Sequence, residues 1–297
     1  MKASLSILIP TRNDKCLQLV RDLSLQASKN KGLQYEIIVA DDGSTDKIVI
    51  AENKGISDID SCHYIIRGEN VGRSAIRNYL AQIAHHQWLL FIDGDMSIQD
   101  NDFLNKYIKT SDEEKVVYGG YKVIGNMKDN LRYLYEKHSE KAHSLNNRLK
   151  HPNKDFHTSN FLIHKDLMHK YPLDMKYRGY GYEDVAYGKQ LQESGILISH
   201  IENPVGFNRF EENADFIDKT EESIRTLKMH KNDLHDYSRL ILLAERLEKI
   251  RLSLFISHLF QKHQQKWQKQ LSGRRPSLFL FNIYKIGYYL NINPTLL

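Results

Sequence analysis

Four short apolar runs alternate with segments of helical periodicity over the first 92 residues, and this alternation limits the fold more than any other feature. The apolar runs are LSILIP (5–10), YEIIVA (35–40), HYIIR (63–67) and WLLFI (88–92). Apolar residues at helical spacing occupy residues 14–28, about 46–54 and about 73–86. Farther along the chain, strands are expected over VVYGGY (116–121) and FHTSNFLI (156–163), and helices over residues 130–150 and about 236–270. Strands that alternate with helices predict an α/β fold with a mostly parallel, doubly wound sheet. A length of 297 residues allows one such domain and an appendage.

Three polar clusters follow these strands at the points where the strands end. They are TRND (11–14), DDGSTD (41–46) and DGD (93–95). Because ligands of such sheets bind at the carboxyl ends of the strands, we expect the clusters to share one rim and to form the site. The second cluster also contains helix-capping residues, and Ser44 or Thr45 is expected to cap the helix that follows.

Asp93 and Asp95 stand one residue apart after an entirely apolar run. Paired carboxylates at a strand end suit a hard divalent cation, because Mg²⁺ and Mn²⁺ prefer oxygen ligands and take phosphate oxygens as partners. Gly94 between them lets the backbone bend and approach a ligand closely. Asp-Gly-Asp is also a common turn sequence, so a purely structural role is the alternative.

Two further stretches carry acidic residues that suit either a binding or a structural role. Asp42 can accept a hydrogen bond from a nucleobase N–H or a ribose hydroxyl, or it can serve the turn and cap that its neighbours form. In RGYGYEDVAYG (178–188), two glycines alternate with tyrosines before Glu183 and Asp184. Acidic residues favour the first turn of a helix, but a Gly-aromatic loop also suits a sugar platform with an adjacent carboxylate as general base.

Together these motifs resemble one family of enzymes. SILIPTRND, IIVADDGSTD, NVGRSAIRN and FIDGDM, in this order, are similar to the N-terminal half of family 2 glycosyltransferases, which have the GT-A fold. GYGYEDVAYGKQL resembles the Gly-aromatic-Gly-x-Glu-Asp segment of galactosyltransferase-type and chondroitin-polymerase-type members. The resemblance covers roughly residues 4–200, and FIDGDM corresponds to the DxD motif of the family.

The resemblance implies an inverting, metal-dependent transfer of a sugar from a nucleoside-diphosphate donor, with a UDP-sugar favoured. The acceptor would be a hydroxyl of a glycan or a lipid-linked molecule, in the synthesis of a bacterial polysaccharide or surface glycan. Asp95 would hold Mn²⁺ or Mg²⁺, and Asp93 would reach the ribose or the waters of the metal. Asp42 would accept from the nucleobase N3–H, and Arg77 would reach a phosphate or orient a rim carboxylate. The residues that the resemblance assigns to the nucleotide sugar are Pro10, Arg12, Asn13, Asp42, Arg77, Asp93, Gly94 and Asn160.

On the acceptor side, the resemblance makes Asp184 the general base on the attacking hydroxyl and Glu183 a ligand of an acceptor or donor hydroxyl. Many members place a histidine after this helix as a third metal ligand. His200 in ILISHIENP is the candidate, although Phe207 stands where an NPV-x-His pattern would have its histidine. A structural histidine is the alternative for His200, as a turn-forming asparagine is for Asn160.

Composition and motif content argue against several other classes of protein. No apolar run reaches the roughly 18–20 residues of a membrane span, and the N-terminus lacks a signal-peptide cleavage site, so we expect a cytoplasmic protein. Cys16 and Cys62 have no metal-type spacing and suit a reducing compartment. A net charge of +5 is mild, and no nucleic-acid partner is expected. The chain has no P-loop and no G-x-G-x-x-G after its first strand.

Two other functions stay open. A sugar-nucleotide nucleotidyltransferase has a similar sheet, but it usually carries a Gly-rich loop after its first strand, where this chain has PTRNDK. A non-catalytic module that binds a sugar or nucleotide is the second alternative. The carboxylates of Asp42, Asp95 and Asp184 argue against such a module.

We expect a catalytic domain over residues 1–233 and a helical extension over residues 234–297. From residue 235 onward the extension has ten Lys and Arg against three Asp and Glu, and its apolar residues fall at helical spacing. Such helices pack onto the catalytic domain or onto a second subunit in a homo-oligomer. Alternatively, they form a basic amphipathic patch that rests peripherally on anionic lipid at the inner face of the membrane, which suits a lipid-linked acceptor.

Overall fold

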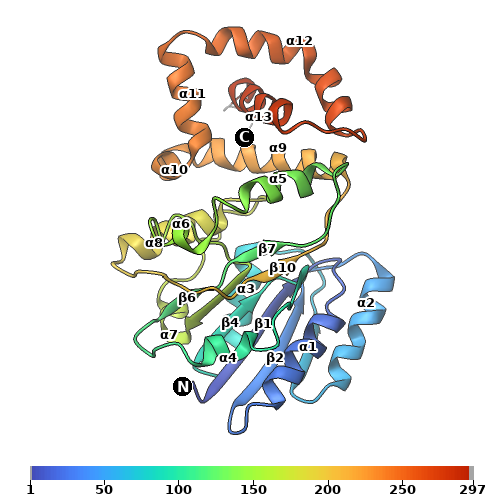
Figure 1. Ribbon diagram of the computed structural model, residues 1–297, viewed down its shortest axis with the longest axis vertical. Helices are drawn as coiled ribbons and strands as arrows, with labels where there is room; N and C mark the ends of the chain where they lie inside the picture. Colours follow the sequence, from blue (N-terminus) through green and yellow to red (C-terminus); the bar gives the residue numbers. More distant parts are fainter. Residues whose placement is uncertain (1, 294–297) are drawn as a thin grey trace. The chain divides into compact units, whose positions relative to one another are not determined.

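The structure is a computed structural model that describes residues 2–293, and its elements follow the expected order (Figure 1). The strands are β1 (Ser4–Thr11), β2 (Gln34–Asp41), β3 (Cys62–Ile66), β4 (Trp88–Ile92), β5 (Met96–Ser97), β6 (Val116–Tyr118), β7 (Tyr121–Val123), β8 (Asn160–His164), β9 (Ser199–His200) and β10 (Val205–Phe207). The helices before residue 200 are α1 (Leu17–Ser28), α2 (Lys47–Asn53), η1 (Lys54–Asp58), α3 (Arg73–Ile83), α4 (Phe103–Ile108), α5 (Leu131–Ser139), α6 (Leu145–Arg148), α7 (Lys165–Lys170) and α8 (Glu183–Glu193). The later helices are α9 (Asn213–Met229), α10 (Lys231–Leu234), η2 (His235–Tyr237), α11 (Arg239–Lys249), α12 (Ser253–Leu271) and α13 (Leu278–Asn291).

The first of two compact units contains the sheet, and it takes in the chain up to Ile124, Ala142–Arg178 and Tyr187–Arg209. Its main sheet has the strand order β3-β2-β1-β4-β8-β6-β9. β1 pairs in parallel with β2 and β4, and β2 pairs in parallel with β3, which confirms the predicted parallel core. β8 runs antiparallel to both of its neighbours, and β5, β10 and β7 form a second, three-stranded sheet.

Helices cover both faces of the main sheet. The chain moves one way across the sheet from β1 to β2 and the other way from β3 to β4, so right-handed crossovers place α1 and α3 on opposite faces. α1 contacts α4 on one face, and α3 contacts α7 on the other (Figure 1). Strands that are covered on both faces are buried along nearly their whole length, as β1 and β4 are. Leu8, Ile38, Leu80, Phe91 and Phe161 are part of this core.

Several predicted elements are shorter or divided in the structure. VVYGGY (116–121) forms two strands in different sheets, because Gly119 and Gly120 interrupt it and Gly120 has φ +87°. The strand expected over 156–163 begins only at Asn160. The helical segments expected over 130–150 and 236–270 each divide into separate helices. Turn geometry of this kind depends on backbone angles that hydrophobic spacing does not report.

The cap of α2 also differs from the prediction. Asp46, rather than Ser44 or Thr45, is the N-cap, and its Oδ1 accepts from the backbone N–H of Ile48 (2.8 Å) and Val49 (3.3 Å). Several capping residues lie in succession here, and sequence alone did not identify the one that the chain uses.

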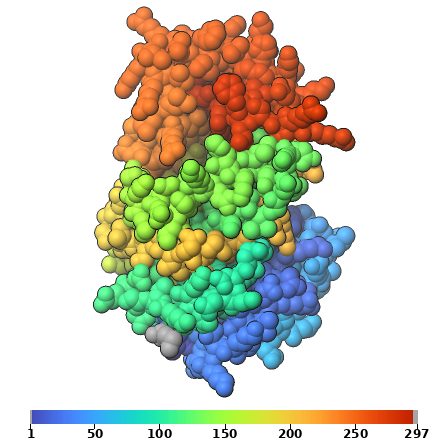
Figure 2. Space-filling model, viewed as in Figure 1, coloured from blue at the N-terminus to red at the C-terminus, as the bar shows by residue number. Residues whose placement is uncertain are grey.

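The second unit is helical and takes in Gly125–Lys141, Gly179–Ala186 and the chain from Phe210 onward. Its core includes Leu131, Phe216, Phe260, Phe281 and Tyr284. The predicted C-terminal helices are present, and Figure 2 shows α11 and α12 in orange and α13 in red on the surface of this unit. α5 and α9, which precede residue 234, belong to the same compact unit. Across residues 2–293, no helix combines the length and apolar character that a bilayer crossing requires.

Candidate functional site

The carboxyl ends of β1, β2 and β4 bring the predicted polar clusters to one edge of the main sheet. Backbone hydrogen bonds join the clusters, since Asp42 N–H donates to the carbonyl of Thr11 (2.8 Å) and Gly94 N–H donates to the carbonyl of Pro10 (3.3 Å). Pro10 is buried at the end of β1. The shared rim that the sequence predicts is therefore present.

Asn13 ties the first rim loop to the second. Its backbone lies in the left-handed region (φ 59°), where Asn is one of the few tolerated side chains. Its Oδ1 accepts from the N–H groups of Thr45 (2.9 Å) and Asp46 (3.0 Å), and its own N–H donates to Ser44 Oγ (2.7 Å). Asn13 thus fixes the shape of the rim, while its neighbour Arg12 is exposed.

Asp42 is buried, and the backbone engages both of its carboxylate oxygens. Oδ1 accepts from Val71 N–H (2.8 Å) and Oδ2 accepts from Gly72 N–H (3.0 Å). These bonds hold the loop that leads into α3. The acceptance of a nucleobase N–H by Asp42 stays a prediction, since a carboxylate that accepts two backbone hydrogen bonds has further lone pairs.

Arg77 is a buried cation that pairs with the rim carboxylate Asp93. Its Nη2 lies 2.5 Å from Asp93 Oδ1, and its Nη1 donates to the carbonyl of Arg73 (3.1 Å). A buried guanidinium that is fixed at two points holds its carboxylate in one place and balances its charge. Of the two roles expected for Arg77, the orientation of a rim carboxylate is the one found here.

The donor set of the rim fits one kind of metal site. Asp93 and Asp95 are half-buried on either side of the buried Gly94. Within residues 2–293, no three His, Cys, Asp or Glu side chains gather in a way that would hold a metal ion. The oxygen donors of Asp93 and Asp95 suit a hard ion of the Mg²⁺ or Mn²⁺ type, which keeps several waters and binds through one or two carboxylates and phosphate oxygens. A closed zinc site does not fit.

Gly94 occupies a position with no room for a side chain. A Cβ there would lie 2.8 Å from Thr11 Oγ1 and 2.9 Å from Cys16 Sγ, and both of these residues are buried. Burial raises the pKa of the Cys16 thiol to about 12, so the group packs here as a neutral thiol. Close packing, in addition to backbone bending, thus requires glycine between the two carboxylates.

The replacement Gly94→Ala is expected to destabilise the protein by about 2 kcal/mol, because the new methyl group forces two packed side chains to move. The melting temperature, measured by circular dichroism, should fall by about 5 °C. Gly68→Ala is the matched control, since no atom lies within 4 Å of the Cβ that it adds. Equal melting temperatures for the two variants would contradict the packing described here.

Asn160 is fully buried, which corrects the expectation that it contacts the sugar. Its Oδ1 accepts from the hydroxyl of Tyr107 (2.7 Å), and its Nδ2 donates to the carbonyls of Gly120 and Asn203, each at 2.8 Å. Both ends of the side chain are therefore used inside the protein. Asn160 joins the start of β8 to the turn after β6 and to the loop after β9, which is a structural role.

His200 has a structural role as well, and the expectation of a third metal ligand is not supported. Its Nε2 lies 2.9 Å from the carbonyl oxygen of Pro152 and donates to it, so Nδ1 accepts from the guanidinium of Arg148 (3.1 Å). Burial, with the nearby charge of Arg148, lowers the pKa of His200 to about 4, and the ring is neutral at pH 7. Both ring nitrogens are engaged, which leaves neither for a metal ion.

Glu183 and Asp184 open α8, and their loop and first turn belong to the second unit. The residue before them, Tyr182, has φ 68°, and Gly181 before it has φ +88°. A non-glycine residue in this region costs about 1–3 kcal/mol and is concentrated at functional sites. The acidic pair complements the positive end of the helix, as the structural alternative proposed. The strained backbone of Tyr182, directly before Glu183 and Asp184, favours a functional role for this acidic pair as well.

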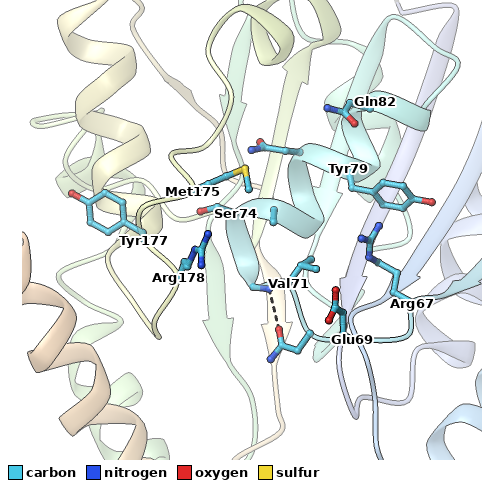
Figure 3. Close-up of a pocket in the computed structure, with 13 residues that line it drawn as sticks. Arg67, Glu69, Val71, Ser74, Tyr79, Gln82, Met175, Tyr177 and Arg178 are labelled. Atoms are coloured by element: carbon cyan, nitrogen blue, oxygen red, sulfur yellow. Dashed lines mark hydrogen bonds between the residues drawn. The ribbon is translucent and has the colours of Figure 1, made fainter. Parts of the chain in front are cut away.

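A pocket of about 670 Å³ lies in the first unit, where the loop after β3, α3 and the segment that ends at Arg178 line it (Figure 3). The guanidinium carbon of Arg67 stands 4.4 Å from the ring centroid of Tyr79 at one side, and Figure 3 shows Arg178 at the other. Ser74, also in the lining, is buried, and within residues 2–293 its Oγ has no hydrogen-bond partner. With Glu69, the lining combines groups of both charges with apolar and aromatic surface, as small-molecule sites do.

Tyr64, near the rim, and Arg178, in the pocket, were not predicted as site residues from the sequence. Tyr64 donates its hydroxyl to the carboxylate of Asp41, and burial together with this carboxylate raises the pKa of Tyr64. Arg178 lines the pocket. The sequence feature that could have indicated Arg178 is its position directly before the Gly-aromatic segment. No sequence feature distinguishes Tyr64 from an ordinary strand residue.

Comparison with known proteins agrees with this architecture. The family model described as "Glycosyl transferase family 2" matches residues 6–171, which is more than half of the chain. A search of curated proteins gives no match. Among solved structures, TarS 1–349 of S. aureus is 16% identical with a TM-score of 0.51, over 98% of this chain and 89% of that one. Its complex with UDP-GlcNAc is 15% identical with a TM-score of 0.52, over 98% and 90%.

A third solved structure is the mannosyltransferase PcManGT from Pyrobaculum calidifontis, in complex with GDP-Man and Mn²⁺. It is 13% identical with a TM-score of 0.52, over 98% of this chain and 81% of that one. At such identities the likeness concerns the fold, and it confirms the predicted GT-A architecture. The match over residues 6–171 establishes more: the chain belongs to glycosyl transferase family 2 and is a glycosyltransferase.

Proposed function

We propose that this glycosyltransferase moves a sugar from a UDP-sugar to a hydroxyl of a glycan or lipid-linked acceptor, with inversion and with Mn²⁺ or Mg²⁺ as cofactor. The observation that carries the proposal is the pair Asp93 and Asp95 at the end of β4, with Arg77 fixed to Asp93. Proteins of the same fold support the donor class, since TarS was solved with UDP-GlcNAc and PcManGT with GDP-Man and Mn²⁺. The proposed setting is the cytoplasm, in the synthesis of a polysaccharide or surface glycan.

The rim carboxylates serve the departure of the diphosphate. Asp95 would hold the cation directly, and Asp93 would bind its waters or the ribose. When bound, the cation neutralises the charge that grows on the leaving diphosphate. Arg77 keeps Asp93 in one orientation and offsets the repulsion between two carboxylates that stand one residue apart.

The nucleoside end of the donor is proposed to meet the loops after β1 and β2. Pro10 and Arg12 lie at the end of β1, and Asn13 fixes the loop after it to the loop after β2. Asp42 acts through the backbone, since it holds Val71 and Gly72 in place. A rim that is shaped before the ligand arrives loses less entropy on binding.

The acceptor is proposed to be activated from the first turn of α8. Asp184 takes the proton of the attacking hydroxyl, and Glu183 binds a hydroxyl of the acceptor or donor. In an inverting displacement, the nucleophile attacks the face of the anomeric carbon opposite the leaving group, so base and diphosphate have separate positions. Support comes from the acidic first turn and from the strained backbone at Tyr182.

Hydrolysis of a panel of sugar nucleotides, with Mn²⁺ and without acceptor, tests the donor class. We expect release of UDP from at least one UDP-sugar, at least about tenfold faster than release from GDP- or CDP-sugars. EDTA should reduce this rate to background. Release of pyrophosphate from UTP and a sugar 1-phosphate would instead indicate a nucleotidyltransferase. If sugar nucleotides raise the melting temperature and none is hydrolysed, a non-catalytic binding module would replace the proposal.

A further inference from the structure

An exposed apolar turn joins α11 to α12 in the second unit (Figure 1). Ile250, Leu252, Leu254 and Phe255 are 62%, 45%, 80% and 65% exposed. Single exposed apolar residues are normal on a protein surface, whereas contiguous groups mark interaction surfaces. Four such side chains within six residues form a group of this kind, and residues 249–255 are called the docking tip below.

The backbone holds the docking tip in one shape. Arg251 has φ 59°, in the left-handed region where a side chain costs about 1 kcal/mol relative to glycine. The N–H of Arg251 donates to the carbonyl of Glu248 (3.0 Å), and the N–H of Leu252 donates to that of Leu247 (2.9 Å), which closes the end of α11. Glycine is the usual residue at such a helix end. This chain has an arginine instead, which places a cation among the apolar side chains.

Cations surround the apolar side chains of the docking tip. Arg246, Lys249 and Arg251 are exposed, and Glu248 is the only acidic residue between positions 246 and 262. Apolar side chains flanked by Lys and Arg suit an anionic lipid surface, because the apolar groups enter the acyl boundary while the cations stay at the phosphate level. A second copy of the same tip would bring like charges together, so self-association through this surface is disfavoured.

We propose that the docking tip binds an anionic lipid surface and holds the protein on the membrane peripherally. Leu254 and Phe255 provide the apolar contact, and Lys249 and Arg251 provide the contact with phosphate. This inference is independent of the proposed sugar transfer, because it requires neither nucleotide nor metal. It identifies the part of the basic C-terminal region that makes the contact.

Sedimentation with vesicles of phosphatidylcholine, with and without phosphatidylglycerol, tests the proposal on the whole chain without nucleotide. Wild type should bind the anionic vesicles and not the neutral ones. Leu254→Ser with Phe255→Ser should weaken binding at least about tenfold, since two apolar side chains no longer leave water. Lys249→Gln with Arg251→Gly should weaken binding to anionic vesicles about fivefold for each charge removed. The same double substitution should make vesicle binding less dependent on salt concentration. Glycine at position 251 keeps the turn.

The matched control is Phe279→Ser, which removes another exposed aromatic residue (76% exposed) from the same unit. Ser257 Oγ donates to Asn291 Oδ1 (2.8 Å), so the start of α12 lies beside the end of α13. Phe279, at the start of α13, is therefore about 25 Å away from the docking tip along the helix pair. This control should bind vesicles as wild type does.

Three results would overturn the proposal. Wild type that binds neutral and anionic vesicles equally, or neither, would exclude an anionic lipid partner. A Leu254→Ser, Phe255→Ser variant that binds as tightly as Phe279→Ser would exclude the docking tip. A change in molar mass by light scattering in that variant, with vesicle binding retained, would make the turn a protein interface. The rate of sugar-nucleotide hydrolysis should be equal in all these variants. The hydrolysis assay therefore tests the proposed sugar transfer independently of vesicle binding.

Discussion

Asp95→Ala is expected to lower kcat/KM for sugar transfer by at least about 1,000-fold, because removal of a group that neutralises the leaving diphosphate raises the barrier by about 4 kcal/mol. Asp93 does not take over its role, since Arg77 already holds that carboxylate at 2.5 Å. Asp95 is half-buried at the rim, so the substitution should leave the fold and the melting temperature nearly unchanged. Release of UDP in the presence of Mn²⁺ measures the loss.

The control for Asp95→Ala is Asp58→Ala, which removes an exposed carboxylate from η1. Its rate should stay within about twofold of wild type, because surface charges far from the site have small effects. If Asp95→Ala retained about a tenth or more of the activity with Mn²⁺, the carboxylate would not be the metal ligand that the proposal requires.

Asp184→Asn is expected to lower kcat about 1,000-fold while KM for the donor and binding of UDP stay unchanged, because an amide keeps the shape of the carboxylate and cannot take a proton. The substitution leaves Glu183 to complement the helix end, so the change in stability should be a few tenths of a kcal/mol. Steady-state kinetics over a range of pH measures both effects. The rise in kcat with pH that reports a general base should disappear in the variant.

The control for Asp184→Asn is Glu193→Gln at the opposite end of α8, where an exposed carboxylate lies 3.6 Å from Lys189. Its kcat and pH profile should match those of wild type. An Asp184→Asn enzyme with full kcat, or one with the wild-type pH profile at a reduced rate, would show that another group accepts the proton.

The parallel core and the rim were predictable from sequence because both follow from local patterns. Each buried strand is a short apolar run, and polar residues follow the ends of β1, β2 and β4, so the order of elements fixes which clusters meet. The motif that the chain shares with its family left two roles open for Arg77, and the structure shows its pairing with the rim carboxylate Asp93. Gly94 was recognised for backbone freedom, although its tight contact with Thr11 and Cys16 required the structure.

The roles of Asn160 and His200 were not predictable, because they depend on residues far along the chain. Asn160 is bonded to Tyr107, 53 positions away, and His200 to Arg148, 52 positions away. The identity of a residue as asparagine or histidine does not tell whether its polar atoms face a ligand or form hydrogen bonds inside the protein. Burial and partners decide between these roles, and neither is encoded in a short motif.

Titration calorimetry of UDP, with Mn²⁺ and with EDTA, tests most directly whether the rim carboxylates hold a cation that also binds the diphosphate. Our account predicts that the Kd of the wild-type protein is at least about tenfold lower with Mn²⁺, and that Asp95→Ala removes this difference. An equal Kd for UDP in Mn²⁺ and in EDTA would contradict it.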